Sequence, residues 1–329
     1  MVEKTDYKEF TFSRGRVGYV HVTGASENRA LISDWTGTIT AVNICTGKVL
    51  AAVHVELMSG TGVTLNSLVV DPKEQRFCAA STRANFAAVW DLDGQSRVAR
   101  LNTTSGAPVN TITWSPDSRR LALGTGYYPL NDSHKLGRIE IWEFAEGSWS
   151  FCYSAVMPGV CVAGLAWSPD GDRLLASVGA LNQKDCHLVW LDAETLRVEQ
   201  AHMFSFGTQA VSDIICISDN CDDALVTFNK CLTRVSMDSD PVVWSWEWDT
   251  PHSIAFDKSE ETIFLDSGLV LDAYSWSARR KDVDGESRRQ ISPVLDDCTS
   301  VSVHPNGKLL GVNKHGKLGV WRRLGECRQ

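Results

Sequence analysis

One turn motif recurs along the whole chain and constrains its fold more than any other feature. Its clearest copies are Trp114-Ser115-Pro116-Asp117 and Trp167-Ser168-Pro169-Asp170-Gly171, each with a short apolar segment on either side. Weaker copies bring the number to seven, and the residue after the leading apolar position falls at 23, 71, 115, 168, 218, 257 and 304. The spacings are therefore 48, 44, 53, 50, 39 and 47 residues. Short strands repeated with a period in the forties are typical of a β-propeller, in which each repeat forms one sheet, or blade.

The segments around these turns predict an all-β fold, a seven-bladed β-propeller of four-stranded antiparallel blades. We expect a single domain over residues 1–329, because one blade cannot bury both of its own faces. Blades 1 to 6 are predicted at 18–55, 65–102, 109–154, 162–204, 212–248 and 252–294. Blade 7 begins at 300, but only three strands fit between there and residue 322.

The missing strand of blade 7 has a candidate at the other end of the sequence. Residues 7–12 read as a strand that no other blade needs. We expect this N-terminal strand to become the fourth, outermost strand of blade 7, so that the ring is closed within one blade. Such closure would cover a sheet edge that could otherwise pair with another chain. An open ring, or six blades with a tail, is the alternative.

Amino-acid composition indicates which kinds of partner the protein can bind and in which cellular compartment it works. The net charge of −8 and pI of about 5.5 argue against nucleic acid as the ligand, since phosphate binding needs a basic surface. The polar N-terminus does not resemble a signal peptide, and no stretch approaches 18 apolar residues, so we expect no membrane association. The ten cysteines include no Cys-x-x-Cys pair. We interpret them as free thiols of a cytoplasmic protein in a reducing compartment.

The ends of the predicted third strands resemble those of the WD-repeat family. They read Val89-Trp90-Asp91, Ile141-Trp142-Glu143, Val189-Trp190-Leu191-Asp192 and Val320-Trp321-Arg322. Only Trp90-Asp91 matches the signature dipeptide literally, and Gly106-Ala107 and Gly159-Val160 stand where the family has Gly-His. The resemblance implies a protein-interaction scaffold that holds partners on the face formed by the loops between the second and third strands and between successive blades.

Two neighbouring loops on that predicted face are longer than their equivalents, namely 126–137 in blade 3 and 179–186 in blade 4. Exposed tyrosines supply the rigid contact area and the hydroxyl group that anchor protein interfaces. We therefore predict a site for protein partners, with no cofactor and no metal. Its candidate residues are Tyr127, Tyr128, Leu130, Asn131, His134, Lys135, Leu181 and Gln183.

Two other classes of function stay open at this stage. An enzyme or a small-molecule or metal-binding propeller would work in the central channel, where His21, His252, Asp213 and Asp249 are the candidates. No sequence motif for a catalytic nucleophile, a metal site or a phosphate loop accompanies them, so we expect no enzyme. A structural subunit of a larger complex would use the alternating Trp244, Trp246 and Trp248, which share one face of a strand.

Overall fold

In the computed structural model of the protein, the described residues form strands and turns. These residues are 2–4, 7–13, 21–25, 28–34, 36–55, 65–93, 96–126, 136–157, 159–179, 185–205, 213–228, 231–239, 242–245, 253–257, 262–266, 269–272, 288–292 and 295–321. The chain divides into two compact units. Unit 1 comprises Met1–Val55 and Trp246–Gln329, and unit 2 comprises Glu56–Ser245.

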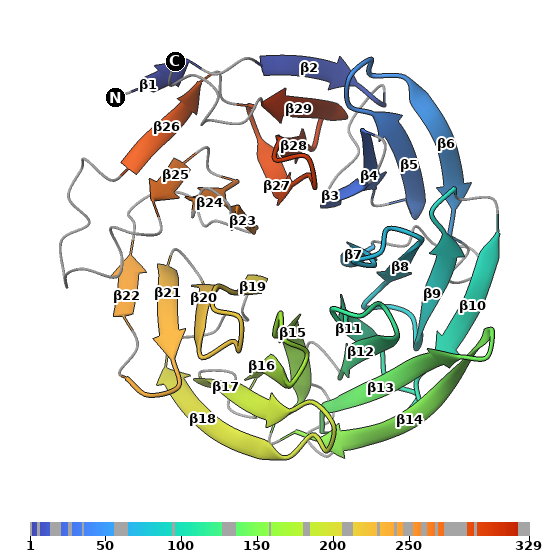
Figure 1. The fold of residues 1–329 in the computed structure, drawn as a ribbon, viewed down its shortest axis with the longest axis vertical. Coiled ribbons are helices and arrows are strands. Elements are labelled where there is room, and N and C mark those ends of the chain that lie inside the picture. The colour runs from blue at the N-terminus through green and yellow to red at the C-terminus, as the bar shows by residue number, and fades with distance from the viewer. Residues whose placement is uncertain are drawn as a thin grey trace. The chain divides into compact units, whose positions relative to one another are not determined.

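Unit 2 contains four four-stranded antiparallel sheets whose strand order follows the chain (Figure 1). The first two sheets are β7 (Ser67–Val70), β8 (Arg76–Ala80), β9 (Phe86–Asp91), β10 (Arg97–Asn102), and β11 (Val109–Trp114), β12 (Arg120–Thr125), β13 (Arg138–Ala145), β14 (Ser148–Val156). The other two are β15 (Cys161–Trp167), β16 (Arg173–Gly179), β17 (Asp185–Asp192), β18 (Val198–Ser205), and β19 (Asp213–Cys216), β20 (Asp223–Phe228), β21 (Cys231–Ser236), β22 (Val242–Ser245). Successive sheets meet along their first strands, β7, β11, β15 and β19.

Unit 1 contains two more four-stranded antiparallel sheets and one sheet of five strands. The first is β3 (His21–Ala25), β4 (Arg29–Ser33), β5 (Thr38–Asn43) and β6 (Val49–His54). The second is β27 (Cys298–Val303), β28 (Leu309–Asn313), β29 (Lys317–Trp321) and β2 (Tyr7–Thr11). The five-stranded sheet is β23 (Ile254–Asp257), β24 (Thr262–Leu265), β25 (Leu269–Asp272), β26 (Arg288–Ser292) and β1 (Val2–Lys4).

The N-terminal strand β2 pairs with the last strand of the chain, as the sequence predicted. It runs antiparallel to β29, from Tyr7 opposite Trp321 to Thr11 opposite Lys317. The Tyr7 and Trp321 rings lie 5.0 Å apart, and the Lys317 ammonium contacts the Glu9 carboxylate at 2.8 Å. Aromatic contact and opposite charges across the ladder are the usual stabilising pairs of an antiparallel sheet. The strand expected to complete the last blade therefore does so.

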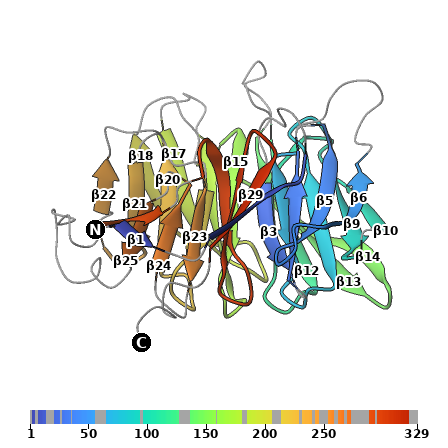
Figure 2. The same ribbon diagram turned by 90° about the horizontal axis from the view of Figure 1, so that it is seen from above.

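The prediction of seven four-stranded antiparallel blades is wrong in number, because the described residues form six such blades. The sheet expected to be blade 6 has a fifth strand, β1, which pairs in parallel with β26 from Val2–Gln290 to Lys4–Ser292 (Figures 1 and 2). The outer edge of a sheet offers unpaired backbone groups to any extended segment within reach. Ladder hydrogen bonds are made by backbone groups that almost every residue carries, so the polar sequence of β1 gave no sign of a strand.

The recurring motif of the sequence forms the turn between the first and second strands of a sheet. In two copies the serine hydroxyl, Ser115 or Ser168, donates to the aspartate two residues on and accepts from the backbone N–H of the arginine five residues on. The fourth residue of each turn has a positive φ, as in Ser118 (63°), Gly171 (88°) and Cys221 (59°). The short polar side chain thus satisfies backbone groups that a tight turn leaves unpaired.

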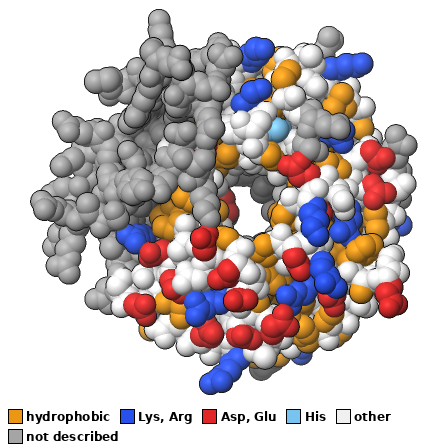
Figure 3. All heavy atoms as spheres, viewed as in Figure 1, with side chains coloured by type: hydrophobic (Ala, Val, Ile, Leu, Met, Phe, Trp, Pro, Cys, Tyr) orange, Lys and Arg blue, Asp and Glu red, His pale blue; other side chains and the backbone are white. Residues whose placement is uncertain are grey.

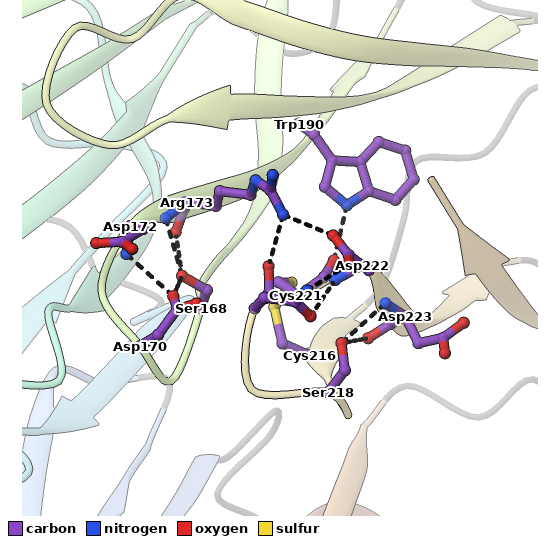
Figure 4. The surroundings of a disulfide bond; sticks show 11 residues. Ser168, Asp170, Asp172, Arg173, Trp190, Cys216, Ser218, Cys221, Asp222 and Asp223 are labelled. Atoms are coloured by element: carbon purple, nitrogen blue, oxygen red, sulfur yellow. Dashed lines mark hydrogen bonds and ion pairs between the residues drawn. A yellow bond between two sulfur atoms is a disulfide. The ribbon is translucent and has the colours of Figure 1, made fainter. Parts of the chain in front are cut away.

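An arginine that begins the second strand joins each of three sheets to the next one, and we call these contacts arginine clasps. Arg76 donates to the Ser118 carbonyl at 3.1 Å and lies over the Phe144 ring at 4.3 Å. Arg120 bonds Glu194 at 2.8 Å. Arg173 bonds Glu199 at 2.6 Å within its own sheet. It also bonds Asp222 of the next sheet at 2.6 Å (Figure 4). Burial alone would lower the pKa of Arg173, but these two carboxylates raise it.

The interpretation of all ten cysteines as free thiols is also wrong, because Cys216 and Cys221 form a disulfide bond. Their Cα atoms lie 4.9 Å apart, which is within the range that a disulfide can span. Cys216 ends β19 and Cys221 occupies the turn before β20, so the hairpin itself brings the two sulfur atoms together. Other described cysteines are free thiols, namely Cys45, Cys78, Cys152, Cys161, Cys186 and Cys298.

The clasp of Arg76 should contribute more stability than an exposed arginine on the neighbouring sheet. Arg76 is 8% exposed and contacts aromatic rings, whereas the Arg119 side chain is 61% exposed and lies 3.8 Å from Glu143. We expect Arg76→Met to lower the free energy of unfolding by about 2 kcal/mol, and Arg119→Met by less than about 0.5 kcal/mol. Urea unfolding of both variants measures the difference. Equal losses would show that the aromatic contacts of Arg76 do not stabilise the fold.

Candidate functional site

All eight residues predicted to bind partners lie outside the described residues, since they fall within 127–135 and 180–184. The structure instead shows the strand ends that carry these two segments. The first segment leaves β12 after Thr125 and returns to β13 at Arg138, and the second leaves β16 after Gly179 and returns to β17 at Asp185. Both therefore belong to the same end of neighbouring sheets. We call the described residues around these strand ends the loop base.

Backbone hydrogen bonds join the two halves of the loop base through Met157 and residues 159–161. On the side of β12 and β13, the N–H of Gly137 donates to Gly159 at 2.7 Å, and Gly126 pairs with Cys161 in a β-bridge. On the side of β16, the N–H of Val160 donates to Gly179 at 3.0 Å. The two predicted loops thus start from one continuous hydrogen-bonded platform in unit 2.

Glycine is required at two positions where backbones meet in this platform. Gly126 has φ +149°, and a Cβ atom there would meet the backbone of Val160 and Cys161. A Cβ atom on Gly159 would meet the carbonyl oxygen of Gly179. A conventional side chain at either position would push the two strand ends apart. The close approach therefore depends on residues that carry no side chain.

A buried carboxylate fixes the connection that precedes β11 next to the loop base. The Glu140 side chain on β13 is fully buried and accepts hydrogen bonds from both the backbone N–H and the hydroxyl of Thr104, at distances of 2.7–3.1 Å. Thr104 lies between β10 and β11, so this contact ties one sheet of unit 2 to the next. A buried carboxylate is tolerated only when it accepts such bonds. The contact is structural, because both oxygen atoms already have donors.

Two buried thiols flank Gly179 on a single rung of the β15–β18 sheet. Cys161 pairs with Gly179, and Gly179 pairs with Cys186. Burial raises the pKa of both thiols, that of Cys186 to about 12. At neutral pH both are therefore protonated and behave as small apolar side chains.

Of the four candidates for a channel site, the structure describes the side chain of Asp213 alone. His252 and Asp249 lie outside the described residues, and only the backbone of His21 is described, in β3. The carboxylate of Asp213, at the start of β19, accepts the backbone N–H of Ile214 at 2.9 Å. The Trp-rich segment is described only for Trp244, in β22, and not for its side chain.

The surface of the described residues carries charges of both signs. Figure 3 shows acidic and basic side chains interspersed on the visible face of unit 2, without one large region of a single sign. Among the described residues there is no group of three or more potential metal ligands. Within the same part of the chain, no helix is long and apolar enough to cross a membrane.

The sequence analysis did not predict the arginine clasps, although a regular spacing in the sequence indicates them. An arginine follows five residues after Asp71, Ser115 and Ser168, so the same spacing occurs in three consecutive repeats. That regularity could have identified Arg76, Arg120 and Arg173 as a set. The sequence alone does not show which residues of the next sheet they contact.

Comparison with known proteins supports the fold and does not assign a family or a function. No family model matches the chain, and no curated protein matches it in sequence. Among solved structures, a chain of the hydrazine synthase of Kuenenia stuttgartiensis is similar over 95% of this chain and 98% of its own, with a TM-score of 0.73 and 16% identity. That chain is also a β-propeller. The fold of this protein is thus a β-propeller with four-stranded antiparallel blades.

A methyl group at Gly159 should disturb the loop base. We expect Gly159→Ala to lower the free energy of unfolding by about 1–3 kcal/mol, because the added Cβ atom meets the backbone of Gly179. Gly147→Ala is the matched control, since its φ is +79° but nothing lies within 4 Å of the added atom. That control should lose only about 1 kcal/mol from backbone strain. Thermal or urea unfolding separates the two, and equal losses would contradict the packing described here.

The buried thiols should resist alkylation in the folded protein. At pH 8 we expect iodoacetamide to modify the exposed Cys45 and to leave Cys186 unmodified, because burial keeps the Cys186 thiol protonated and out of reach. In denaturant both should react at similar rates. Peptide mass spectrometry measures each site. Rapid modification of Cys186 in the native protein would show that the end of the β15–β18 sheet opens readily.

Proposed function

We propose that this protein is a non-catalytic scaffold that binds protein partners at the end of unit 2 where the loop base lies. The observation that carries the proposal is the set of backbone hydrogen bonds made by Met157 and residues 159–161. These bonds place the starting points of the segments 127–135 and 180–184 on one platform. Two long segments anchored side by side can present a single surface, as binding loops on a rigid sheet framework commonly do. The partner is expected to be a protein, alone or within a multi-protein complex.

The residue types in these segments fit a protein partner better than other ligands. Tyr127 and Tyr128 can supply aromatic contact area with a hydroxyl group, while Asn131, His134 and Gln183 can adapt their hydrogen bonds to a partner. The negative net charge disfavours nucleic acid. In the sequence, no catalytic motif lies in or beside either segment, which is why we propose binding without catalysis.

We also propose that the protein is a divergent relative of the WD-repeat propellers and works in a reducing, cytoplasmic environment. The literal Trp90-Asp91 pair supports the first point. Exposed free thiols at Cys45 and Cys152 support the second, because such thiols oxidise readily outside the cell. Trapping thiols by alkylation during lysis of the native host, followed by peptide mapping, tests the compartment. Recovery of Cys45 and Cys152 as disulfides would contradict it.

Replacing the two tyrosines should weaken partner binding without affecting the fold. We expect Tyr127→Ala combined with Tyr128→Ala to cost about 2 kcal/mol of binding free energy, or roughly 30-fold in Kd. Arg119→Ala is the control, because Arg119 lies at the opposite end of the same sheet, in the turn before β12. Affinity capture from the native host identifies the partner, and calorimetry with the purified partner gives Kd. Unchanged affinity in the double variant, with an intact fold, would remove this site.

A further inference from the structure

The disulfide Cys216–Cys221 occupies a turn that holds two sheets together. Figure 4 shows the turn of the β19–β22 sheet facing Arg173 and Trp190, which belong to the β15–β18 sheet. The indole N–H of Trp190 donates to the Cys221 carbonyl at 2.8 Å, and Arg173 bonds Asp222 at 2.6 Å. The backbone N–H of Asp170 also donates to the Asp219 carbonyl at 2.9 Å. Every one of these contacts involves residues 219–222, within the disulfide loop or next to it.

The disulfide constrains a backbone conformation on which those contacts depend. Cys221 has φ +59°, which is unfavourable for a residue with a side chain. Equivalent turns have glycine here at Gly171 and Gly307, and residues with side chains at Glu74 and Ser118, all with positive φ. Cys221 is fully buried in the apolar cluster that contains Trp190, Ile214 and Ala224, with Cys216 packed against it. Cross-linking to Cys216 therefore holds Cys221 in a left-handed conformation that costs free energy for a residue with a side chain.

We propose that Cys216 and Cys221 form a reversible redox site, and that its oxidation state controls how firmly the 217–222 turn is held against the β15–β18 sheet. The oxidation states of the described cysteines support reversible formation of this disulfide. Within the described residues this is the one disulfide, whereas six other cysteines, two of them exposed, are free thiols. A single disulfide among free thiols is typical of redox sensing rather than of a disulfide framework.

The size of the loop limits the effect of reduction to the turn. The bridge joins residues five positions apart, so it removes less chain entropy than a bridge that closes a long loop. The turn also has backbone hydrogen bonds that do not need the disulfide, such as Ile217 N–H to Asp223 and Cys221 N–H to Ser218, at 3.0 and 3.2 Å. Reduction should therefore loosen the turn without unfolding unit 2.

The chemistry is thiol–disulfide exchange with a small-molecule thiol. Its thiolate attacks the sulfur of Cys216, which is half-buried whereas Cys221 is fully buried. The Cys216–Cys221 bond breaks, Cys221 leaves as a thiolate and takes up a proton, and a mixed disulfide forms on Cys216. A second small thiolate then attacks the small-molecule sulfur of that mixed disulfide and releases Cys216. Two small thiols are oxidised to their disulfide, and the two cysteines are reduced. The small-molecule disulfide drives the reverse reaction.

Redox titration of the full-length protein tests the proposal. The protein is equilibrated in buffers of reduced and oxidised glutathione, alkylated, and analysed by peptide mass spectrometry, with hydrogen exchange measured on the fully oxidised and fully reduced samples. We expect one reversible transition at Cys216 and Cys221. Reduction should speed amide exchange in 217–223 by up to roughly 30-fold, the factor that a cross-link of this loop size contributes. Exchange in sheets away from the turn should be unchanged.

Two variants keep the outcome interpretable. Cys221→Gly removes the sulfur and introduces the residue that two equivalent turns have, at Gly171 and Gly307, so it should fold and show no redox response. Cys152→Ser removes an exposed free thiol and should respond like the unmodified protein. The proposal is overturned if Cys216 and Cys221 stay fully alkylatable in oxidised glutathione, or if the disulfide resists reduction in the folded protein. It is also overturned if exchange in 217–223 is the same in both states.

Discussion

The structure depends on the packing of sheet against sheet, because a single four-stranded blade exposes an apolar surface on both faces. In unit 2, Ile139 and Ile141 of β13 pack in one buried cluster with Leu165 and Trp167 of β15. On the other face of the same sheet, Leu121 and Leu123 belong to a cluster with Val89 of β9. Each fully buried aliphatic side chain contributes about 1.5–3 kcal/mol, so these clusters outweigh any individual polar contact. Clasps and turns then set the positions of sheets that apolar packing has already brought together.

The sequence predicted what its repeated local patterns encode. The Ser-x-Asp turns at Ser115 and Ser168 form as expected, because their hydrogen bonds involve neighbouring residues. The position of β2 beside β29 could be deduced from a strand missing at the end of the chain. The strand β1 and the partners of Arg76 and Arg173 could not be deduced, because they depend on segments brought close only by the folded chain.

Cysteine was the residue type for which composition misled most. The absence of a Cys-x-x-Cys pair suggested free thiols throughout. A hairpin turn, however, also brings two cysteines five positions apart within bonding distance, as it does for Cys216 and Cys221. Cys221 stands in a turn position that glycine occupies in two other repeats and residues with side chains occupy in two more, so its role could not be deduced from the sequence. The candidate partner site was predicted from loop length and composition. Its platform, by contrast, depends on Gly126 and Gly159, whose importance lies in backbone contacts that composition does not reveal.

The pairing of β2 with β29 has a consequence for synthesis. Trp321, the partner of Tyr7, leaves the ribosome some three hundred residues after Tyr7 itself. During translation β2 must therefore stay unpaired until β29 has emerged. Contacts between such distant segments carry a high entropic cost and form slowly. The pairing of β2 with β29 is thus a late step in folding, and any peptide fused ahead of Tyr7 would have to accompany β2 into place.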